Sequence, residues 1–238
     1  MRKDTKHLLD EICKLESIED FLFVGGTAMA YHVTHRVSED LDFGFLGFKL
    51  PTTSIKDIIS RLSQSHSVSM QTDVTAIQEA ENEGINLLDH HQDWLVGEVK
   101  VTFFTLGEDV KEREAIQAFS TSKYGHVNVL DLDGLFFTKC MVLTRRVKSR
   151  DIFDLWWFTE HGNKTIQDIF NTIQHVMPYM TYEMIRHRLL DWPISLTDEG
   201  LEPVGINLGI EGVRNLLREK VNQLEVNMAK AYLSDSNH

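Results

Sequence analysis

Residues 21–45 constrain this chain most, because an apolar run, a glycine pair and two alternating carboxylates follow one another there. Residues 21–24 are apolar and rich in strand-forming side chains, which favours a short buried strand. Gly25 and Gly26 end this run, and the next residues have helical spacing, so we expect Thr27 to cap a new helix. A glycine pair at such a junction lets backbone amides approach an anion closely. The pattern predicts a phosphate-binding turn.

Two carboxylates alternate with apolar side chains directly after this helix. On a strand, Asp40 and Asp42 would project from one face, while Leu41 and Phe43 would lie on the other. Two carboxylates about 4 Å apart repel by roughly 4 kcal/mol at an effective dielectric constant near 20. A hard cation between them would relieve this repulsion, and Mg²⁺ or Mn²⁺ bridging to nucleotide phosphates is the natural candidate. We therefore predict that Asp40 and Asp42 bind a metal.

Composition excludes several classes of protein. The formal net charge of −12 over 238 residues argues against a generally basic surface of the kind that binds nucleic acid. No apolar stretch is long enough to span a bilayer, and the first residues lack the apolar core of a signal peptide, so we expect a cytoplasmic protein. Cys13 and Cys140 have no paired spacing, which predicts two reduced structural thiols and no zinc site.

The chain changes its hydrophobic period near residue 125. The first part mixes helical spacing with strand patterns, and the expected elements are helices at 3–17 and 54–64 and strands at 68–78 and 94–106. The second part is helical almost throughout, with expected helices at 130–146, 151–161, 165–177, 181–190 and 211–233. We predict an α/β (α+β) protein with a mixed-sheet core at 1–125 and a helical domain at 126–238.

A second informative segment lies in the helical part. Residues 139–150 carry five basic side chains and no acidic one. Lys139 and Arg146 are seven residues apart, so they would share a helix face and could point at one site. Asp151 and Asp154 share a face of the next helix. The alternatives remain open: the cations could complement a helix dipole, and these residues could form interhelical salt bridges that only hold the corner together.

These residues together resemble the successive motifs of the AbiEii-type nucleotidyltransferase family, within the DNA polymerase β-like superfamily. The residues that carry the resemblance are Gly25, Gly26, Thr27, Ala28, His35, Arg36, Ser38, Asp40, Asp42, Lys139, Arg146, Arg150, Asp151, Asp154 and Leu155. It covers roughly residues 20–160, and the order of the motifs is more specific than the glycine motif alone. The family includes toxins of bacterial toxin-antitoxin and abortive-infection systems.

The resemblance implies transfer of a nucleoside monophosphate from a nucleoside triphosphate to a hydroxyl of RNA, such as a transfer RNA 3′ end, or of a protein. It assigns nucleotide binding to Gly25, Gly26, Thr27 and Ser38, and metal binding to Asp40 and Asp42. Lys139 and Asp154 match the later lysine and aspartate that family members need for activity. Lys139 would neutralise charge on the triphosphate, and Asp154 would orient Lys139 or act as a base, of which we prefer orientation. Arg36 and Arg146 are candidates for phosphate contacts. A cognate antitoxin is an implied partner.

One position departs from the superfamily pattern, which has a third carboxylate on a later strand. Thr102 stands there in this chain, and Glu98 lies earlier on the same expected strand face. Either Glu98 substitutes, or two carboxylates suffice, or the site is impaired. Two other functions therefore stay open: a nucleotide-binding or partner-binding module without transfer, and a nucleotide-dependent kinase that uses the same lysine and carboxylates.

Overall fold

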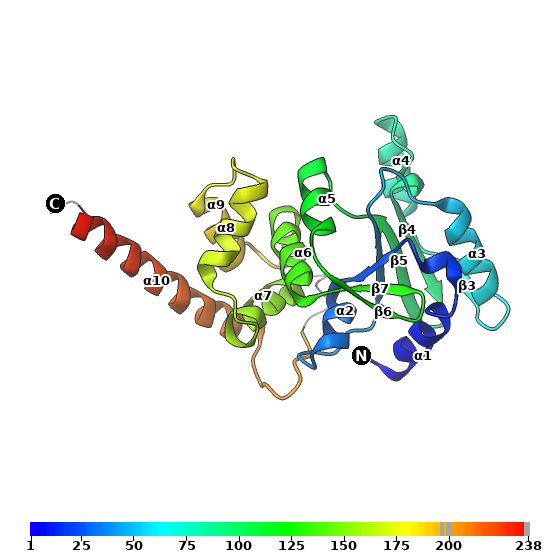
Figure 1. The fold of residues 1–238 in the computed structure, drawn as a ribbon, viewed down its shortest axis with the longest axis horizontal. Helices are drawn as coiled ribbons and strands as arrows, with labels where there is room; N and C mark the ends of the chain where they lie inside the picture. Colours follow the sequence, from blue (N-terminus) through cyan, green and yellow to red (C-terminus); the bar gives the residue numbers. More distant parts are fainter. Residues whose placement is uncertain (196–197, 199–200, 236–238) are drawn as a thin grey trace. The chain divides into compact units, whose positions relative to one another are not determined.

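The computed structural model describes residues 1–195, 198 and 201–235. The chain divides into two compact units, Met1–Leu135 and Phe136–His238. The first unit contains a mixed sheet with helices, and the second unit is helical in its described part (Figure 1). The predicted fold class is confirmed. The proposed boundary near residue 125 stays a prediction.

The first unit is built on one seven-stranded sheet with the order β3-β4-β5-β2-β1-β7-β6. Its strands are β1 (Leu22–Val24), β2 (Leu41–Phe45), β3 (Val68–Met70), β4 (His91–Val96), β5 (Val99–Thr105), β6 (Thr121–Tyr124) and β7 (Val127–Leu130). β1 pairs with β7 and β2 with β5 in parallel, while the other pairs are antiparallel. Residue 125 lies in the turn of the β6–β7 hairpin.

Aromatic side chains form the core on one face of the central strands. Phe23 pairs with Phe43 and Phe43 with Phe103 in register, so the three rings lie side by side on that face. The ring centroids of Phe43 and Phe103 are 5.7 Å apart, and both side chains are fully buried. Since side chains alternate along a strand, Asp42 and Thr102 lie on the opposite face.

The first unit also contains helices, which occur between its strands or at its start along the chain. They are α1 (Lys3–Ile12), α2 (Gly25–His32), α3 (Thr52–Leu62), α4 (Val74–Asn82) and α5 (Val110–Gln117). α1 contacts β5 and α2 contacts β1 and β2. The apolar stripe of α1, with Leu8, Leu9 and Ile12, is buried, as its spacing predicts.

Two strand predictions were partly wrong. The expected strand at 68–78 ends at Met70, and α4 follows because Asp73 caps it: the Asp73 carboxylate accepts a hydrogen bond from the Thr75 backbone amide. The expected strand at 94–106 is a hairpin of β4 and β5, with a turn at Gly97, whose φ of +60° suits glycine. The sequence analysis did not predict α5, β6 and β7.

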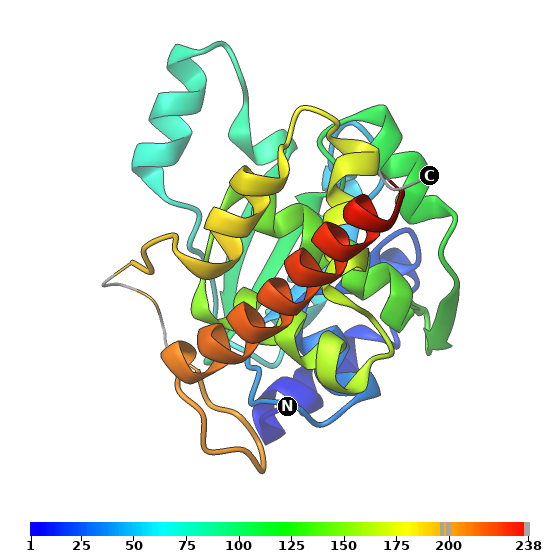
Figure 2. The ribbon, with the colours of Figure 1, turned by 90° about the vertical axis from the view of Figure 1, so that its left-hand side faces the viewer.

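The second unit packs around the last helix. Its helices are α6 (Leu132–Arg145), which begins in the first unit, α7 (Ser149–His161), α8 (Ile166–Val176), α9 (Tyr182–Leu190) and α10 (Ile210–Asp235), all close to their predicted ranges. α10, orange to red in Figure 2, contacts α7, α8 and α9. Val213, Leu217 and Val221 form its fully buried stripe. Phe170 of α8 stacks on Tyr182 of α9 with ring centroids 4.4 Å apart.

Two further sequence predictions concern the membrane and the cysteines. Across the described ranges, no helix combines the length and the apolar character needed to cross a membrane. Cys13 and Cys140 are free and buried, as expected of structural thiols. Burial raises the pKa of both thiols, and Cys140 is shifted well above its ordinary value.

Candidate functional site

Gly25 lies directly against the Asp42 carboxylate. β1 runs into α2 without a loop, and Gly25, the first residue of α2, has a φ of +76°. Val24 pairs with Asp42 on the neighbouring strand. A Cβ atom on Gly25 would lie 2.2 Å from Oδ2 of Asp42, so only glycine fits. The register of β1 and β2 therefore sets a carboxylate at the start of a helix, where backbone amides favour negative charge.

Gly26 packs against a cation and a hydroxyl. A Cβ atom there would lie 2.1 Å from Nη2 of Arg36 and 3.1 Å from Oγ of Ser38. Arg36 is only 3% exposed, and its Nη1 donates to the Val37 carbonyl at 3.2 Å. The structure thus brings the predicted nucleotide-binding residues Arg36 and Ser38 onto the glycine turn.

Thr27 does not cap α2, so that prediction was wrong. α2 begins two residues earlier, at Gly25, and Thr27 is buried in its first turn. Its hydroxyl donates to the Asp40 carbonyl, and its Oγ1 lies 2.8 Å from Oγ of Ser38. Thr27 therefore ties the segment before β2 to the glycine turn, which positions Asp40 and Ser38.

The two predicted metal ligands lie at the start of β2. Asp40 directly precedes the strand, Asp42 is its second residue, and both side chains are half-buried. Carboxylate oxygens suit Mg²⁺ or Mn²⁺, which commonly bind one or two protein carboxylates together with substrate phosphates. Within the described ranges, no three acidic, histidine or cysteine side chains are grouped to hold a metal by themselves. Asp40 and Asp42 are thus donors of the kind that such a cation binds.

The strands beside β2 carry a residue that the sequence analysis missed. Asp42 pairs with Thr102 on β5, and Thr102 pairs with Asp93 on β4. Oγ1 of Thr102 donates to Oδ1 of Asp93 at 2.7 Å. The alternation of His91 and Asp93 in residues 91–96 could have revealed a strand with a polar face, but the sequence analysis placed residues 94–96 in one longer strand and assigned residues 91–93 to no element.

Asp93 is a half-buried anion that several donors contact. Its side chain is 15% exposed, Nζ of Lys100 lies 3.0 Å from Oδ2, and Nε2 of His91 lies 3.2 Å from Oδ1. Burial would raise the pKa of Asp93, but hydrogen bonds from His91, Thr102 and Lys100 outweigh it and hold this pKa far below its usual range. Asp93 is therefore ionised at neutral pH.

Glu98 does not occupy the strand face on which the sequence analysis expected it. It lies in the exposed β4–β5 turn, before β5 begins at Val99. Glu98 precedes Thr102 by four residues, which is two repeats of a strand. The acidic side chains in register with Thr102 are Asp42 on β2 and Asp93 on β4.

In the second unit, Lys139 is held by two buried carboxylates. Nζ of Lys139 on α6 lies 2.7 Å from Oδ1 of Asp151 and 2.8 Å from Oδ2 of Asp154, both on α7. Lys139 is 6% exposed and Asp154 is fully buried. These contacts are the salt bridges between helices that one of the two alternatives predicted. The role of Asp154 in orienting Lys139 for a reaction stays a prediction.

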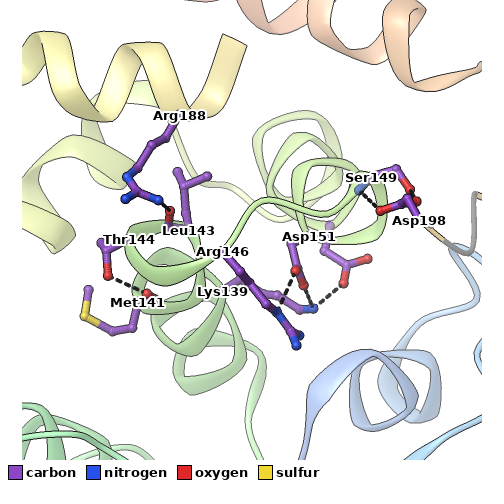
Figure 3. A network of polar contacts seen from close by, with 10 residues as sticks. Lys139, Met141, Leu143, Thr144, Arg146, Ser149, Asp151, Arg188 and Asp198 are labelled. Carbon is purple, nitrogen blue, oxygen red and sulfur yellow. Dashed lines mark hydrogen bonds and ion pairs between the residues drawn. The ribbon is translucent and has the colours of Figure 1, made fainter. Parts of the chain in front are cut away.

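Arg146 turns toward the same group. Nε of Arg146 lies 3.4 Å from Oδ2 of Asp151, so Lys139 and Arg146 converge on one carboxylate (Figure 3). Burial would raise the pKa of Asp151, but the charges of Lys139 and Arg146 outweigh it and lower this pKa. At the start of α7, the Ser149 amide donates to Oδ2 of Asp198 at 3.0 Å.

The first unit thus brings together Gly25, Gly26, Thr27, Arg36, Ser38, Asp40 and Asp42, and the second unit brings together Lys139, Arg146 and Asp154. Each cluster lies within one unit. The roles predicted for these residues stay predictions.

Comparison with known families identifies the class of protein. The family model described as "Nucleotidyl transferase AbiEii toxin, Type IV TA system" matches residues 7–184. The match spans most of the chain, including both residue clusters, so the class is that of the nucleotidyltransferases. The chain belongs to the AbiEii family of nucleotidyltransferase toxins.

Similar solved structures exist at low identity. The chain is similar to the JHP933 protein from Helicobacter pylori, with 12% identity, 96% of this chain and 97% of that chain covered, and a TM-score of 0.45. It is also similar to the Megavirus polyadenylate synthase, with 9% identity, 66% and 31% of the two chains covered, and a TM-score of 0.42. Curated protein sequences give no significant match.

Proposed function

We propose that this protein transfers a nucleoside monophosphate from a nucleoside triphosphate to an acceptor hydroxyl. The acceptor oxygen forms a bond to the α-phosphorus, the bond from this phosphorus to the β-phosphate oxygen breaks, and pyrophosphate leaves while the hydroxyl proton passes to solvent. The observation that carries the proposal is the glycine turn packed against Asp42 and Arg36 in a chain of the AbiEii family.

In this proposal the glycine turn binds the triphosphate. The first-turn amides of α2 donate to phosphate oxygens, and the Arg36 guanidinium and Ser38 hydroxyl, which lie against Gly26, add a charge and a hydrogen bond. Asp40 and Asp42, at the start of β2, would hold Mg²⁺ or Mn²⁺, which would supply positive charge against the phosphates and help to align the reacting oxygens.

We further assign Lys139, Arg146 and Asp154 to the reaction. The Lys139 ammonium would neutralise negative charge that develops on the triphosphate, Asp154 would orient Lys139, and Arg146 would contact phosphate. Support comes from chemistry: Lys139 is a buried cation held at 2.7 and 2.8 Å by two carboxylates, so its position is fixed. A fixed charge costs little reorganisation during a reaction.

The acceptor class follows from the family and from local charge. We propose RNA, such as a transfer RNA 3′ end, or a protein hydroxyl as the acceptor. Residues 145–150 hold four cations in an otherwise acidic protein, which favours an anionic acceptor or the triphosphate itself. We also propose that a cognate antitoxin restrains the activity of the protein in the cytoplasm, as in a toxin-antitoxin system.

The test follows labelled phosphate. The protein is incubated with Mg²⁺, a total RNA and protein pool, and each nucleoside triphosphate labelled at either the α or the γ position. The proposal expects α label in RNA or protein, lost with EDTA and in Asp42→Ala and Lys139→Ala. Asp20→Ala and Lys56→Ala, at exposed positions, are matched controls that keep activity.

Two outcomes favour the alternative functions. Transfer of γ label instead of α label would indicate a kinase. If the wild type and both site variants bind nucleotide but transfer no label, the protein is a binding module. The presence of Thr102 at the expected position of the third carboxylate is the reason for considering this alternative.

A further inference from the structure

The polar face of the sheet carries one row of three side chains across β2, β5 and β4. Asp42, Thr102 and Asp93 are partners in register, and side chains of registered neighbours point to the same face. Adjacent strands are about 4.8 Å apart, so Thr102 stands one strand from Asp42 and Asp93 two strands away. Any group that reacts beside Asp42 on the β5 side meets Thr102 first.

The hydroxyl of Thr102 has a fixed direction. A threonine hydroxyl donates one hydrogen bond and accepts with two lone pairs. An ionised carboxylate only accepts, so the 2.7 Å contact with Oδ1 of Asp93 uses the Thr102 proton. The lone pairs of Thr102 Oγ1 are left to accept, and Thr102 is 6% exposed, which shields this hydrogen bond from water.

Asp93 is itself kept in place by its other donors. Lys100 lies two residues from Thr102, and His91 lies two residues from Asp93, so both side chains are on the same face as the row. Nζ of Lys100 lies 3.0 Å from Oδ2 of Asp93, and Nε2 of His91 lies 3.2 Å from Oδ1. Thr102, His91 and Lys100 all contact this carboxylate and hold its pKa far below its usual range, so Asp93 makes a poor proton acceptor. Its suited role is to fix the Thr102 hydroxyl.

We propose that Thr102 is a catalytic residue that accepts a hydrogen bond from the acceptor hydroxyl beside Asp42, and that Asp93 is a positioning residue that acts through Thr102. The inference rests on the proposed nucleotidyl transfer and explains how the site works without a carboxylate at position 102. Thr102 aligns the attacking oxygen and takes no proton.

The experiment is a double-mutant cycle in the labelled transfer assay. Thr102→Val removes the hydroxyl at nearly equal volume, Asp93→Asn weakens the anchor, and the third variant combines both. Thr102→Ser restores the hydroxyl, and Thr105→Val makes the same change on the opposite face of β5. Each variant is measured for kcat, for the KM of the nucleotide and of the acceptor, and for its thermal unfolding midpoint.

We expect Thr102→Val and Asp93→Asn each to lower kcat by about 10-fold, since one aligned hydrogen bond is worth about 1.4 kcal/mol. The KM for the nucleotide stays unchanged. The double variant loses no more than Thr102→Val alone, because Asp93 acts through Thr102. Thr102→Ser keeps most activity, and Thr105→Val keeps all of it.

Several results would overturn the inference. Full kcat in a folded Thr102→Val removes the role of the hydroxyl, and losses that multiply in the double variant show that Asp93 acts independently of Thr102. If Asp93→Asn fails to fold, the Thr102→Val and Thr102→Ser pair still decides the role of Thr102. Transfer that requires Asp42 but is insensitive to Thr102 overturns the inference alone, whereas no transfer by the wild type overturns the proposed function with it.

Discussion

At the residue scale, Gly25 has a left-handed backbone conformation and lies against the Asp42 carboxylate. We expect Gly25→Ala to destabilise the protein by more than the about 1–2 kcal/mol that a left-handed alanine costs, because its Cβ would also meet Oδ2 of Asp42. Nucleotide affinity should fall as well, since the carboxylate must move. Urea unfolding and nucleotide titration measure both effects.

Gly84 supplies the matched control. Its φ of +77° equals that of Gly25 to within one degree, but no atom lies within 4 Å of the position of its Cβ. Gly84→Ala should therefore show only the backbone cost and leave nucleotide affinity unchanged. Equal effects of the two substitutions would refute the importance of the contact with Asp42.

Lys139 is the residue whose removal should affect stability as well as activity. Lys139→Met leaves two carboxylates buried without their shared cation, and breaking such a group costs about 3–5 kcal/mol. Urea unfolding at neutral pH tests this, with Lys56→Met as the exposed control. Because a Lys139 variant could lose transfer activity by unfolding, its stability must be measured together with its activity. A Lys139→Met variant as stable as the wild type would contradict the ion-pair geometry.

At the element scale, capping of α8 offers a change that should leave the chemistry intact. The Thr165 side chain accepts from the Asp168 backbone amide, and the Asp168 side chain accepts in return from the Thr165 amide. Thr165→Ala should lower the free energy of unfolding by about 1 kcal/mol without changing kcat. A drop in kcat, measured on the folded variant, would show that α8 takes part in the reaction.

The elements also show what sequence patterns could and could not predict. The strand and carboxylate pattern of residues 21–45 and the helices of the second unit were predicted because local periodicity determines them. The row of Asp42, Thr102 and Asp93 was not predicted, because it depends on how neighbouring strands are aligned. The sequence pattern of a single strand does not determine this register. The hairpin turn at Gly97 was missed for a simpler reason: the apolar residues on both sides of it were read as one strand.

At the scale of the whole molecule, acid should unfold the protein in part through Asp93 and Asp151. Both carboxyl groups have a pKa lowered by folding, so they stabilise the protein above the unfolded pKa of about 4 and lose this contribution as the pH falls below it. The free energy of unfolding should therefore depend less steeply on pH below pH 4 in Asp151→Asn than in the wild type. Asp20→Asn should keep the wild-type slope.

The most direct measurement of the central claim is pyrophosphate release that accompanies incorporation of α label. With Mg²⁺ and an acceptor pool, the wild type and Asp20→Ala should release one pyrophosphate for each nucleoside monophosphate transferred. Asp42→Ala should release none. Equal release by Asp42→Ala, or incorporation of label without pyrophosphate, would contradict a nucleotidyltransferase site at the glycine turn and Asp42.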